Sequence, residues 1–392
     1  MKILVGHNHY QQAGGEDAVA ASEVQMLRAQ GHDVLYVEFD NKDFNDLSAP
    51  AKFQNVLSWD WSKKAYEIIR QHCISFNPDV AHFHNTFYMM TPAVYSACQS
   101  MKVPVVQTLH NFRLLCSNGL FYRQGKVCEE CLSHTLKRGI KYGCYRHSRV
   151  LTWAVVNMLE KHWKQRTWHN KVDRFIALTD FARGKFIEGG LPGERIVVKS
   201  NSIAIDPGCR ERAGEHFVFA GRLSEEKGIK VVLEAFRYLP NEKLMVMGDG
   251  PLKLDCENYI KKYGLQNIQL LGHLDKKDYY ETLKKAKALI VPSRLYENFP
   301  VVIIEAFACG VPVIASRLGS MKEIVVEGQT GLLFDPGVSK DLIQKINDLS
   351  QNPSGMIAWG QEARRLFESK HSAEINGKEL ISIYQQLKDA SR

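Results

Sequence analysis

Residues 296–315 read YENFPVVIIEAFACGVPVIA and combine two acidic residues, a proline and two apolar runs. The pattern predicts a loop that enters a buried helix near Pro300, because proline lacks the N–H that a first helical turn leaves unpaired anyway. Asn298 is the expected N-cap of this helix. The backbone N–H groups of Val301 and Val302 would then be available to an anion at the helix start.

Two glutamates flank the start of this predicted helix. Glu297 precedes it, and Glu305 lies about one turn inside it. A ligand there could place phosphate at the helix end and hydroxyl groups on both carboxylates, which are good hydrogen-bond acceptors. A nucleotide-sugar has this layout. The alternative is a capped core helix with two solvated glutamates, and the segment alone favours neither interpretation.

A second segment carries two cations beside a glycine. The run FVFAGRL at residues 217–223 predicts a buried strand, and EEKGI at residues 225–229 opens a helix. Arg222 and Lys227 could converge beyond the carboxyl end of this strand, where open α/β sheets bind ligands. Both side chains suit a pyrophosphate. The alternative is a pair of solvated cations beside two acids, which is common on protein surfaces.

The order of these motifs resembles glycosyltransferase family 4, whose members are retaining nucleotide-sugar transferases of the GT-B fold. The motifs that carry the resemblance are Gly14-Gly15-Glu16, His110, Gly221-Arg222-Leu223 with Lys227-Gly228, Gly248-Asp249-Gly250, and Glu297-x7-Glu305 with its tail ACGVPVIA. The resemblance runs through nearly the whole chain, and the last motif is its most specific part. The chain departs from the family at residues 297–300, where ENFP stands in place of the common EGFG.

The resemblance also implies roles for individual residues. Arg222 and Lys227 are expected to bind the diphosphate and to stabilise the charge that develops on it. Glu305 is expected to bind the ribose hydroxyls, Glu297 the sugar hydroxyls, and His110 the donor sugar near its anomeric carbon. Further contacts with the donor are assigned to Gly15, Gly272, His273, Asn298, Phe299, Val301 and Val302.

Short β-rich runs alternate with helical segments along the chain, which predicts an α/β fold with parallel sheets covered on both faces. The predicted strands are residues 2–6, 33–39, 79–84, 103–109, 173–178, 216–220, 243–248, 268–271, 288–291 and 311–315. We expect two doubly wound, Rossmann-like domains facing a cleft. The first, acceptor-side domain spans residues 1–199 and the second, nucleotide-sugar-binding domain residues 200–371. By resemblance, a final helix at residues 372–392 crosses back to the first domain.

Composition is that of an ordinary globular protein, with 45% hydrophobic and 24% charged residues in a chain of 392. The sequence has no uninterrupted run of 18 apolar residues, so we expect no membrane-spanning helix. The N-terminal apolar run is too short for a signal peptide. We therefore expect a cytoplasmic protein, at the inner face of the cell membrane if it binds lipid. Its nine cysteines should then be reduced.

Four cysteines form a separate pattern within an insert at residues 111–147. Cys116, Cys128, Cys131 and Cys144 have the spacing C-x11-C-x2-C-x12-C. The compact CEEC pair resembles half of a zinc knuckle, and the outer two thiolates could complete a structural zinc site. The alternative is four unrelated reduced thiols. Zinc is the interpretation that we favour.

Residues 134–174 are strongly basic and contain Trp153, Trp163 and Trp168. A basic amphipathic helix with tryptophans can bind an anionic membrane surface. The alternative, slightly favoured, is a helix that packs on the core and exposes a basic face. Nucleic-acid binding has no motif to support it.

The family resemblance implies a retaining glycosyltransferase without a catalytic metal, and no Asp-x-Asp motif stands out as a metal site. A UDP-sugar is favoured as donor on family frequency alone, and the acceptor is a glycan or lipid-linked glycan of a surface polysaccharide. His82 and His84 are candidates for the acceptor side. The alternatives are an epimerase or sugar phosphorylase of the same fold and, in another class, a zinc-dependent nucleic-acid-binding protein, for which the two glutamates would have no use.

Overall fold

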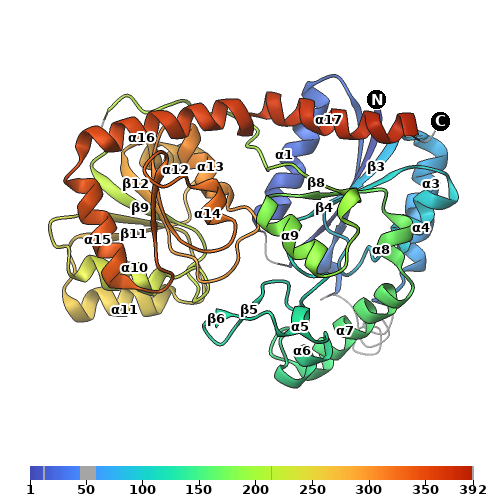
Figure 1. The fold of residues 1–392 in the computed structure, drawn as a ribbon, viewed down its shortest axis with the longest axis horizontal. Coiled ribbons are helices and arrows are strands. Elements are labelled where there is room, and N and C mark those ends of the chain that lie inside the picture. Colours follow the sequence, from blue (N-terminus) through green and yellow to red (C-terminus); the bar gives the residue numbers. More distant parts are fainter. Residues whose placement is uncertain (12–13, 45–58, 213, 391–392) are drawn as a thin grey trace. The chain divides into compact units, whose positions relative to one another are not determined.

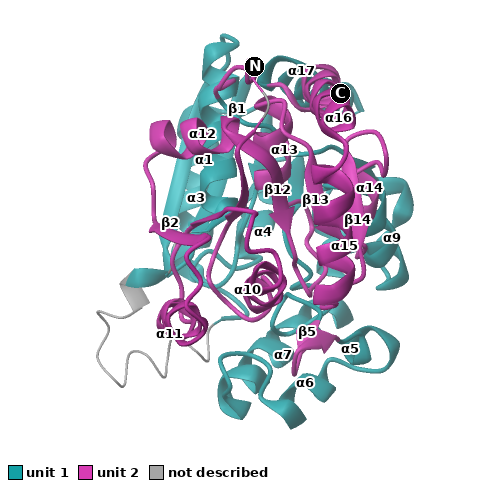
Figure 2. Cartoon of the chain, turned by 90° about the vertical axis from the view of Figure 1, so that its left-hand side faces the viewer, with its two compact units in different colours: residues 1–121, 128–204, 373–392 teal, residues 122–127, 205–372 magenta. Residues whose placement is uncertain are grey.

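The computed structural model describes residues 1–11, 14–44, 59–212 and 214–390. Clustering of contacts divides the chain into two compact units (Figure 2). Unit 1 comprises residues 1–121, 128–204 and 373–392, and unit 2 comprises residues 122–127 and 205–372. No helix among the described residues is long and apolar enough to cross a membrane.

Unit 1 contains a parallel sheet of six strands in the order β2-β1-β3-β4-β7-β8 (Figure 1). Its strands are β1 (Lys2–His9), β2 (Asp33–Asp40), β3 (Val80–Phe83), β4 (Val105–Leu109), β7 (Arg174–Ala177) and β8 (Ile196–Val198). The central strands β3 and β4 are buried along their whole length, as expected where helices cover both faces of a parallel sheet.

The longer helices of unit 1 alternate with these strands. They are α1 (Gly15–Ala29), α3 (Lys63–Phe76), α4 (Ala93–Ser100), α7 (Arg149–Lys164), α8 (Thr167–Lys171), α9 (Asp180–Glu188) and α17 (Ala373–Ala390), with 3-10 turns at Asn41–Phe44 and Gly193–Arg195. Several begin at a side chain that accepts a hydrogen bond from the first turn, as Ser62 does for α3, Ser148 for α7 and Thr179 for α9.

The C-terminal helix α17 belongs to unit 1, as the family resemblance implied. Leu380, Ile383, Tyr384 and Leu387 follow helical spacing and join the buried core that contains Ile3 of β1. Figure 1 shows α17 running along α1 and β3. The helix therefore places the buried Tyr384 against the middle of the first sheet.

Unit 2 repeats the architecture, with strand order β11-β10-β9-β12-β13-β14. Its strands are β9 (His216–Ala220), β10 (Leu244–Met247), β11 (Ile268–Gly272), β12 (Ala286–Val291), β13 (Val313–Ser316) and β14 (Gly331–Phe334). Its helices are α10 (Ile229–Arg237), α11 (Lys253–Tyr263), α12 (Lys276–Lys284), α13 (Val301–Ala308), α14 (Met321–Ile324), α15 (Ser339–Ser350) and α16 (Pro353–Leu366), followed by a π-helical turn at Phe367–His371.

Helix α13 is fixed at its carboxyl end by Arg364 of α16. The guanidinium donates to the carbonyl oxygen of Ala308 at 2.6 Å, a group that the end of a helix leaves without an internal partner. Two parallel hydrogen bonds to Asp206, at 2.7 and 2.6 Å, orient the guanidinium. The helix that carries Glu305 is thus held at a defined position in unit 2.

The insert at residues 111–147 forms small elements. They are the hairpin β5 (Tyr122–Arg123) and β6 (Lys126–Val127), which clusters with unit 2, and the short helices α5 (Glu130–Ser133) and α6 (Lys137–Tyr142). The sequence pattern did not predict β5, β6, β8 or β14. The first three have two or three residues, too few for a strand pattern to be recognised, whereas β14 has four residues, as many as strands that were predicted.

Candidate donor and sugar sites

The carboxyl ends of the strands of unit 2 gather the predicted diphosphate residues. Lys227 lies just before α10, and its Nζ donates to Oε1 of Glu297 at 2.6 Å. Ser293, which follows β12, donates to the same oxygen at 2.6 Å. Glu297 is mostly buried and Lys227 is one-third exposed. The structure therefore brings Glu297 and Lys227 together, and Arg222 lies exposed beyond β9.

The start of α13 corrects one prediction. The helix begins at Val301 with Pro300 as its N-cap residue, and no side chain caps it, so the prediction that Asn298 is the N-cap was wrong. Proline at the cap sets an extended conformation of φ −71° and ψ 102° that turns the chain into the helix. Asn298 and Phe299 are buried in the preceding loop, where Ser320 Oγ donates to the carbonyl oxygen of Glu297. The uncapped helix start remains open to an acceptor from a ligand.

Glu305 is held by three donors of α12 that the sequence analysis did not find. Lys276 Nζ lies 2.6 Å and Tyr280 OH 3.3 Å from Oε1, and Tyr279 OH lies 2.7 Å from Oε2. Burial and the charge of Glu305 raise the pKa of Tyr279 and that of Tyr280 well above the ordinary value for tyrosine. Both phenols therefore keep their protons and remain donors. The carboxylate is 5% exposed and pre-oriented, as hydroxyl recognition requires.

One glycine allows two strand ends of unit 2 to approach each other closely. A Cβ at Gly248 would lie 2.0 Å from the carbonyl oxygen of Gly221, and Gly248 has φ +136°. Gly272 also has a positive φ, +69°, but no atom of the described residues lies within 4 Å of its Cβ position, and His273 after it is exposed. The loop at Gly272 therefore has room for a ligand at the edge of the sheet where open α/β folds bind nucleotides.

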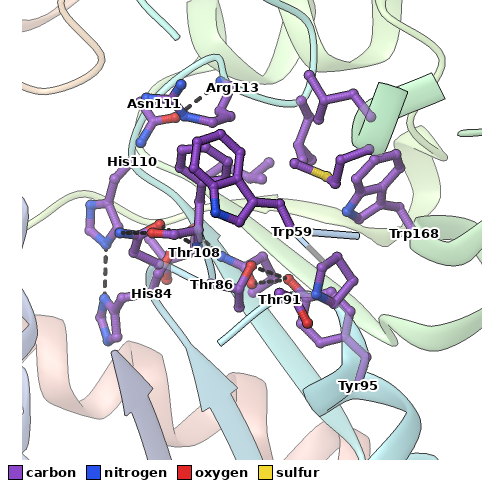
Figure 3. A pocket seen from close by; sticks show the side chains of 18 residues that line it. Trp59, His84, Thr86, Thr91, Tyr95, Thr108, His110, Asn111, Arg113 and Trp168 are labelled. Atoms are coloured by element: carbon purple, nitrogen blue, oxygen red, sulfur yellow. Dashed lines mark hydrogen bonds between the residues drawn. The ribbon is translucent and has the colours of Figure 1, made fainter. Parts of the chain in front are cut away.

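In unit 1, His110 follows β4 and lines a cavity of about 60 Å³ (Figure 3). Its Nε2 lies 2.8 Å from Nδ1 of His84, and the two rings are stacked. Asn111 and Arg113 line the same cavity, whose inner wall includes Trp59 and Trp168. The cavity thus has a polar side at His110 and an aromatic side, a combination common in ligand sites.

A buried charge network lies behind His110. Glu23 of α1 lies 3.1 Å from a ring nitrogen of both His82 and His84, and its other oxygen lies 3.4 Å from Lys199 Nζ. Burial would raise the pKa of Glu23, but Lys199, His84 and His82 outweigh it and hold the pKa well below its usual value. Tyr384 of α17 completes the network, with its hydroxyl 2.6 Å from His82 Nδ1. Sequence analysis did not single out Glu23, Lys199 or Tyr384.

The glycine motif lies at the start of α1. Gly14 is the N-cap residue, its N–H donates to Asp17 at 2.8 Å, and no atom of the described residues lies within 4 Å of a Cβ at Gly14 or Gly15. A ligand contact through the backbone of Gly15 stays a prediction. Glu16 is partly buried, and the burial of its carboxyl group raises its pKa to about 8. Tyr10 OH donates to this carboxyl group at 2.8 Å.

Two groups of side chains among the described residues have metal-ligand spacing. One is His7, His9 and Asp17, and the other is Glu23, His82 and His84. Each of the two groups is also explained by hydrogen bonds and ion pairs, such as His7 Nε2 to Asp17 Oδ1 at 2.7 Å. In the second group, the ammonium of Lys199 lies 3.4 Å from the carboxylate of Glu23 and would repel a metal cation bound to that carboxylate.

The four cysteines of the insert are free thiols and are partly brought together. Cys116 Sγ donates to Asn118 Oδ1 at 3.0 Å. The nearby Cys131 thiol lowers the pKa of Cys116, and Cys144 acts on Cys131. Among the described residues, no cysteine belongs to a group of three potential ligands whose atoms all lie within 4.8 Å. Metal binding would therefore require the thiols to move closer.

The basic tryptophan-containing segment forms α7 and α8 and packs into unit 1. Val156, Leu159 and Trp168 are buried, and Trp163 Nε1 donates to the carbonyl oxygen of Leu114 at 2.9 Å. Trp153 is 48% exposed. The packing matches the core-facing alternative, with a solvated basic face.

Two doubly wound parallel sheets of six strands, with a C-terminal helix packed on the first, define the GT-B class of glycosyltransferases. Sequence comparison gives the family. Residues 13–206 match the model "Glycosyltransferase Family 4" and residues 211–366 the model "Glycosyl transferases group 1". An uncharacterized glycosyltransferase of Methanocaldococcus jannaschii is 34% identical over 99% of both chains. The chain belongs to glycosyltransferase family 4 and is a retaining glycosyltransferase that uses a nucleotide-sugar donor.

More distant relatives share parts of the chain or the fold. The O-antigen chain mannosyltransferase C of Escherichia coli is 26% identical over 45% of this chain and 48% of its own. The crystal structure of Anabaena HepE in complex with UDP-glucose has a TM-score of 0.70 and 16% identity, and the match covers 98% of this chain and all of that one.

Proposed function

We propose that the enzyme transfers a sugar from UDP to a glycan or lipid-linked glycan during synthesis of a surface polysaccharide. The observation that carries the donor site is the arrangement around α13. Glu297 and Lys227 are paired at its start and Glu305 is held one turn inside it. The donor requires a cation for phosphate and two carboxylates for hydroxyl groups, and unit 2 provides them at one edge of its sheet.

We assign the roles in unit 2 as follows. Arg222 and Lys227 bind the diphosphate and stabilise the leaving group, which removes the need for a catalytic divalent metal. Glu305 binds the ribose and Glu297 the sugar. Backbone groups complete the site at Gly272, His273, Asn298, Phe299, Val301 and Val302.

In unit 1 we assign His110 to the donor sugar and the backbone of Gly15 to its phosphate. The cavity beside His110 and the open backbone at Gly15 support these assignments. Uridine as the base is supported by the similar fold of a protein solved with UDP-glucose. A surface polysaccharide as the acceptor is supported by the name of the Escherichia coli relative.

The test is product formation from a panel of UDP-, GDP- and ADP-sugars, with and without glycan acceptors. Lys227→Met is expected to lower kcat/KM about 100-fold, the loss typical of removing one group that stabilises a developing charge. Lys230→Met is the matched control, because Lys230 of α10 is 60% exposed and pairs with Asp255 of α11 instead of Glu297. Unchanged turnover in Lys227→Met would refute the diphosphate role. Sugar interconversion without an acceptor would indicate an epimerase.

We also propose that Cys116, Cys128, Cys131 and Cys144 bind a structural zinc ion. The contact between the Cys116 and Cys131 thiols, close to Cys144, supports this assignment. Metal analysis of the purified protein should find one zinc per chain, lost in Cys131→Ser and retained in Cys209→Ser, since Cys209 is exposed and lies outside the insert. Wild-type protein free of zinc, purified without chelator, would refute the assignment.

Peripheral contact with an anionic membrane is a further proposal, carried by the exposed Val150 and Trp153 on the basic helix α7. Sedimentation with anionic vesicles should be reduced by Trp153→Ala and abolished at high salt. Equal sedimentation of the variant and the wild type would refute a role for this helix.

A further inference from the structure

The chain of contacts from Glu23 to His110 fixes where protons can lie. His84 stands in the middle, with Nε2 3.1 Å from Glu23 Oε1 and Nδ1 2.8 Å from His110 Nε2 (Figure 3). Burial lowers the pKa of His84 to about 4 and that of His110 well below its usual value. Each ring therefore carries one proton at neutral pH.

The proton of His84 belongs on Nε2. The contact to Glu23 is an ion-pair contact rather than an aligned hydrogen bond, and neither atom has a hydrogen-bond partner among the described residues. An unprotonated nitrogen there would set its lone pair 3.1 Å from a carboxylate oxygen, which is repulsive. Lys199 keeps Glu23 ionised, so the preference for N–H persists.

The proton of His110 follows from that of His84. With its proton on Nε2, His84 presents a lone pair at Nδ1, so the 2.8 Å contact requires His110 Nε2 to be the donor. The other nitrogen of His110, Nδ1, is then unprotonated. Within the described part of the chain, no hydrogen bond to this nitrogen is present, and His110 lines the cavity.

We infer that Glu23 and His84 are positioning residues that hold His110 in the Nε2–H tautomer, so that His110 binds its substrate as a hydrogen-bond acceptor. A group that pairs with Nδ1 of His110 must then be a donor, which in a sugar nucleotide means a hydroxyl or N–H group rather than a phosphate or carbonyl oxygen. Since we assign His110 to the transferred sugar, a donor whose sugar lacks this hydroxyl or N–H group should be a poor substrate, because the buried nitrogen would be left unpaired.

The remaining polar neighbours do not compete for the proton of His110. His82 Nε2 is hydrogen-bonded to Thr108 Oγ1 at 2.7 Å, and its Nδ1 is hydrogen-bonded to Tyr384 OH at 2.6 Å and lies 3.1 Å from Glu23 Oε1. Burial raises the pKa of Tyr384 well above its usual value, so the phenol stays neutral. His7 bonds to Asp17 and approaches His84 only at ring-contact distance, 6.2 Å between centroids.

The direct test is long-range ¹H–¹⁵N NMR of protein labelled with ¹⁵N-histidine, which reports the protonation of each ring nitrogen. Signals are assigned with the variants His84→Asn and His110→Asn. At pH 7 we expect Nε2 of His110 to be protonated and Nδ1 unprotonated. A proton on Nδ1 of His110, or a charged ring, would overturn the inference. The tautomer is read from the wild-type protein, and the variants serve only to assign its signals.

Glu23→Gln tests the origin of the tautomer. The amide carries no charge and can turn its NH2 toward His84, so we expect mixed tautomers at His84 and His110. We also expect transfer activity to fall about tenfold, as is typical when an outer partner of a binding histidine is lost. Glu38→Gln is the matched control, because it is also a carboxylate beside a histidine, His9, but is half exposed and outside the network. A pure Nε2–H tautomer in Glu23→Gln would show that Glu23 does not set it.

This inference rests on the proposed role of His110 in binding the sugar, but the two fail separately. If His110→Ala loses transfer and the NMR shows Nδ1–H, the proposed function stands and the tautomer assignment falls. If the NMR shows the expected tautomer and His110→Ala keeps full activity, the network is structural and the proposed function of His110 falls.

Discussion

Replacing Glu297 by glutamine should tighten the binding of UDP while slowing sugar transfer. Oε1 of Glu297 accepts from Lys227 Nζ at 2.6 Å, so the diphosphate must compete with a carboxylate for this cation. The amide removes the competing charge and keeps the size of the side chain. Because UDP lacks the sugar that is transferred, it loses no contact that we assign to Glu297.

The magnitude follows from the exposure of the pair. Lys227 is 33% exposed and Glu297 is 12% exposed, so solvent screens the interaction in part. Partly screened ion pairs contribute about 1 kcal/mol, which corresponds to about fivefold in Kd. The expected result is therefore a UDP Kd about fivefold lower in Glu297→Gln, with a fall in kcat for the complete donor.

The assay is isothermal titration calorimetry with UDP, at one salt concentration, on the wild type, Glu297→Gln and Glu242→Gln. Glu242 is the matched control, because it also pairs with a lysine at 2.6 Å, Lys287, with similar exposure, but precedes β10 at the amino end of the strands. Weaker or unchanged UDP binding in Glu297→Gln would refute the argument that the ion pair competes with the diphosphate. Tighter UDP binding in both variants would show that any loss of negative charge strengthens binding, not the loss of the pair with Lys227.

Three further predictions concern stability. Arg364→Met should lower the free energy of unfolding by about 2–3 kcal/mol in urea denaturation, because it loses the charge-assisted hydrogen bonds to Asp206 and Ala308. The control Arg365→Met, at an exposed residue, should change the free energy of unfolding by less than about 0.5 kcal/mol. Equal effects of the two substitutions would contradict the account. Gly248→Ala should cost about 2 kcal/mol or more and Gly264→Ala about 1, because both glycines have positive φ but only the first lacks space. Burial lowers the pKa of His84 to about 4, so on acidification the unfolded chain binds a proton at this residue before the folded protein does. Stability should therefore fall as pH drops from about 6.5 to 4. A melting temperature that stays level across this range, measured by calorimetry, would contradict this prediction.

Much of the fold follows from local pattern. The predicted strand at residues 216–220 coincides with β9, and the other predicted strands overlap their counterparts. The reason is that buried parallel strands form nearly continuous apolar runs, which stand out between helices. The short edge strand β8 lacks this signal because three residues fit many patterns.

The parts of the site that belong to one contiguous motif could be predicted from the sequence. The parts that the fold brings together from distant segments could not. Glu297 and Glu305 share one segment, but the donors that hold Glu305 come from α12, more than twenty residues earlier. Lys276, Tyr279 and Tyr280 have the helical spacing i, i+3, i+4, a signal that could have been noted. Nothing in the sequence near Glu23 indicates that a carboxylate on an amphipathic helix faces two histidines of a neighbouring strand.

The central claim is that unit 2 binds the nucleotide part of the donor around Glu305. The measurement that tests it most directly is a thermal-shift titration of the wild type and Glu305→Gln with UDP, GDP, ADP and their sugars. The account predicts a rise in melting temperature for one base, with UDP expected, and a clearly smaller rise at the same concentration in the variant. A folded wild-type protein that no nucleotide stabilises, or an equal shift in both proteins, would contradict it.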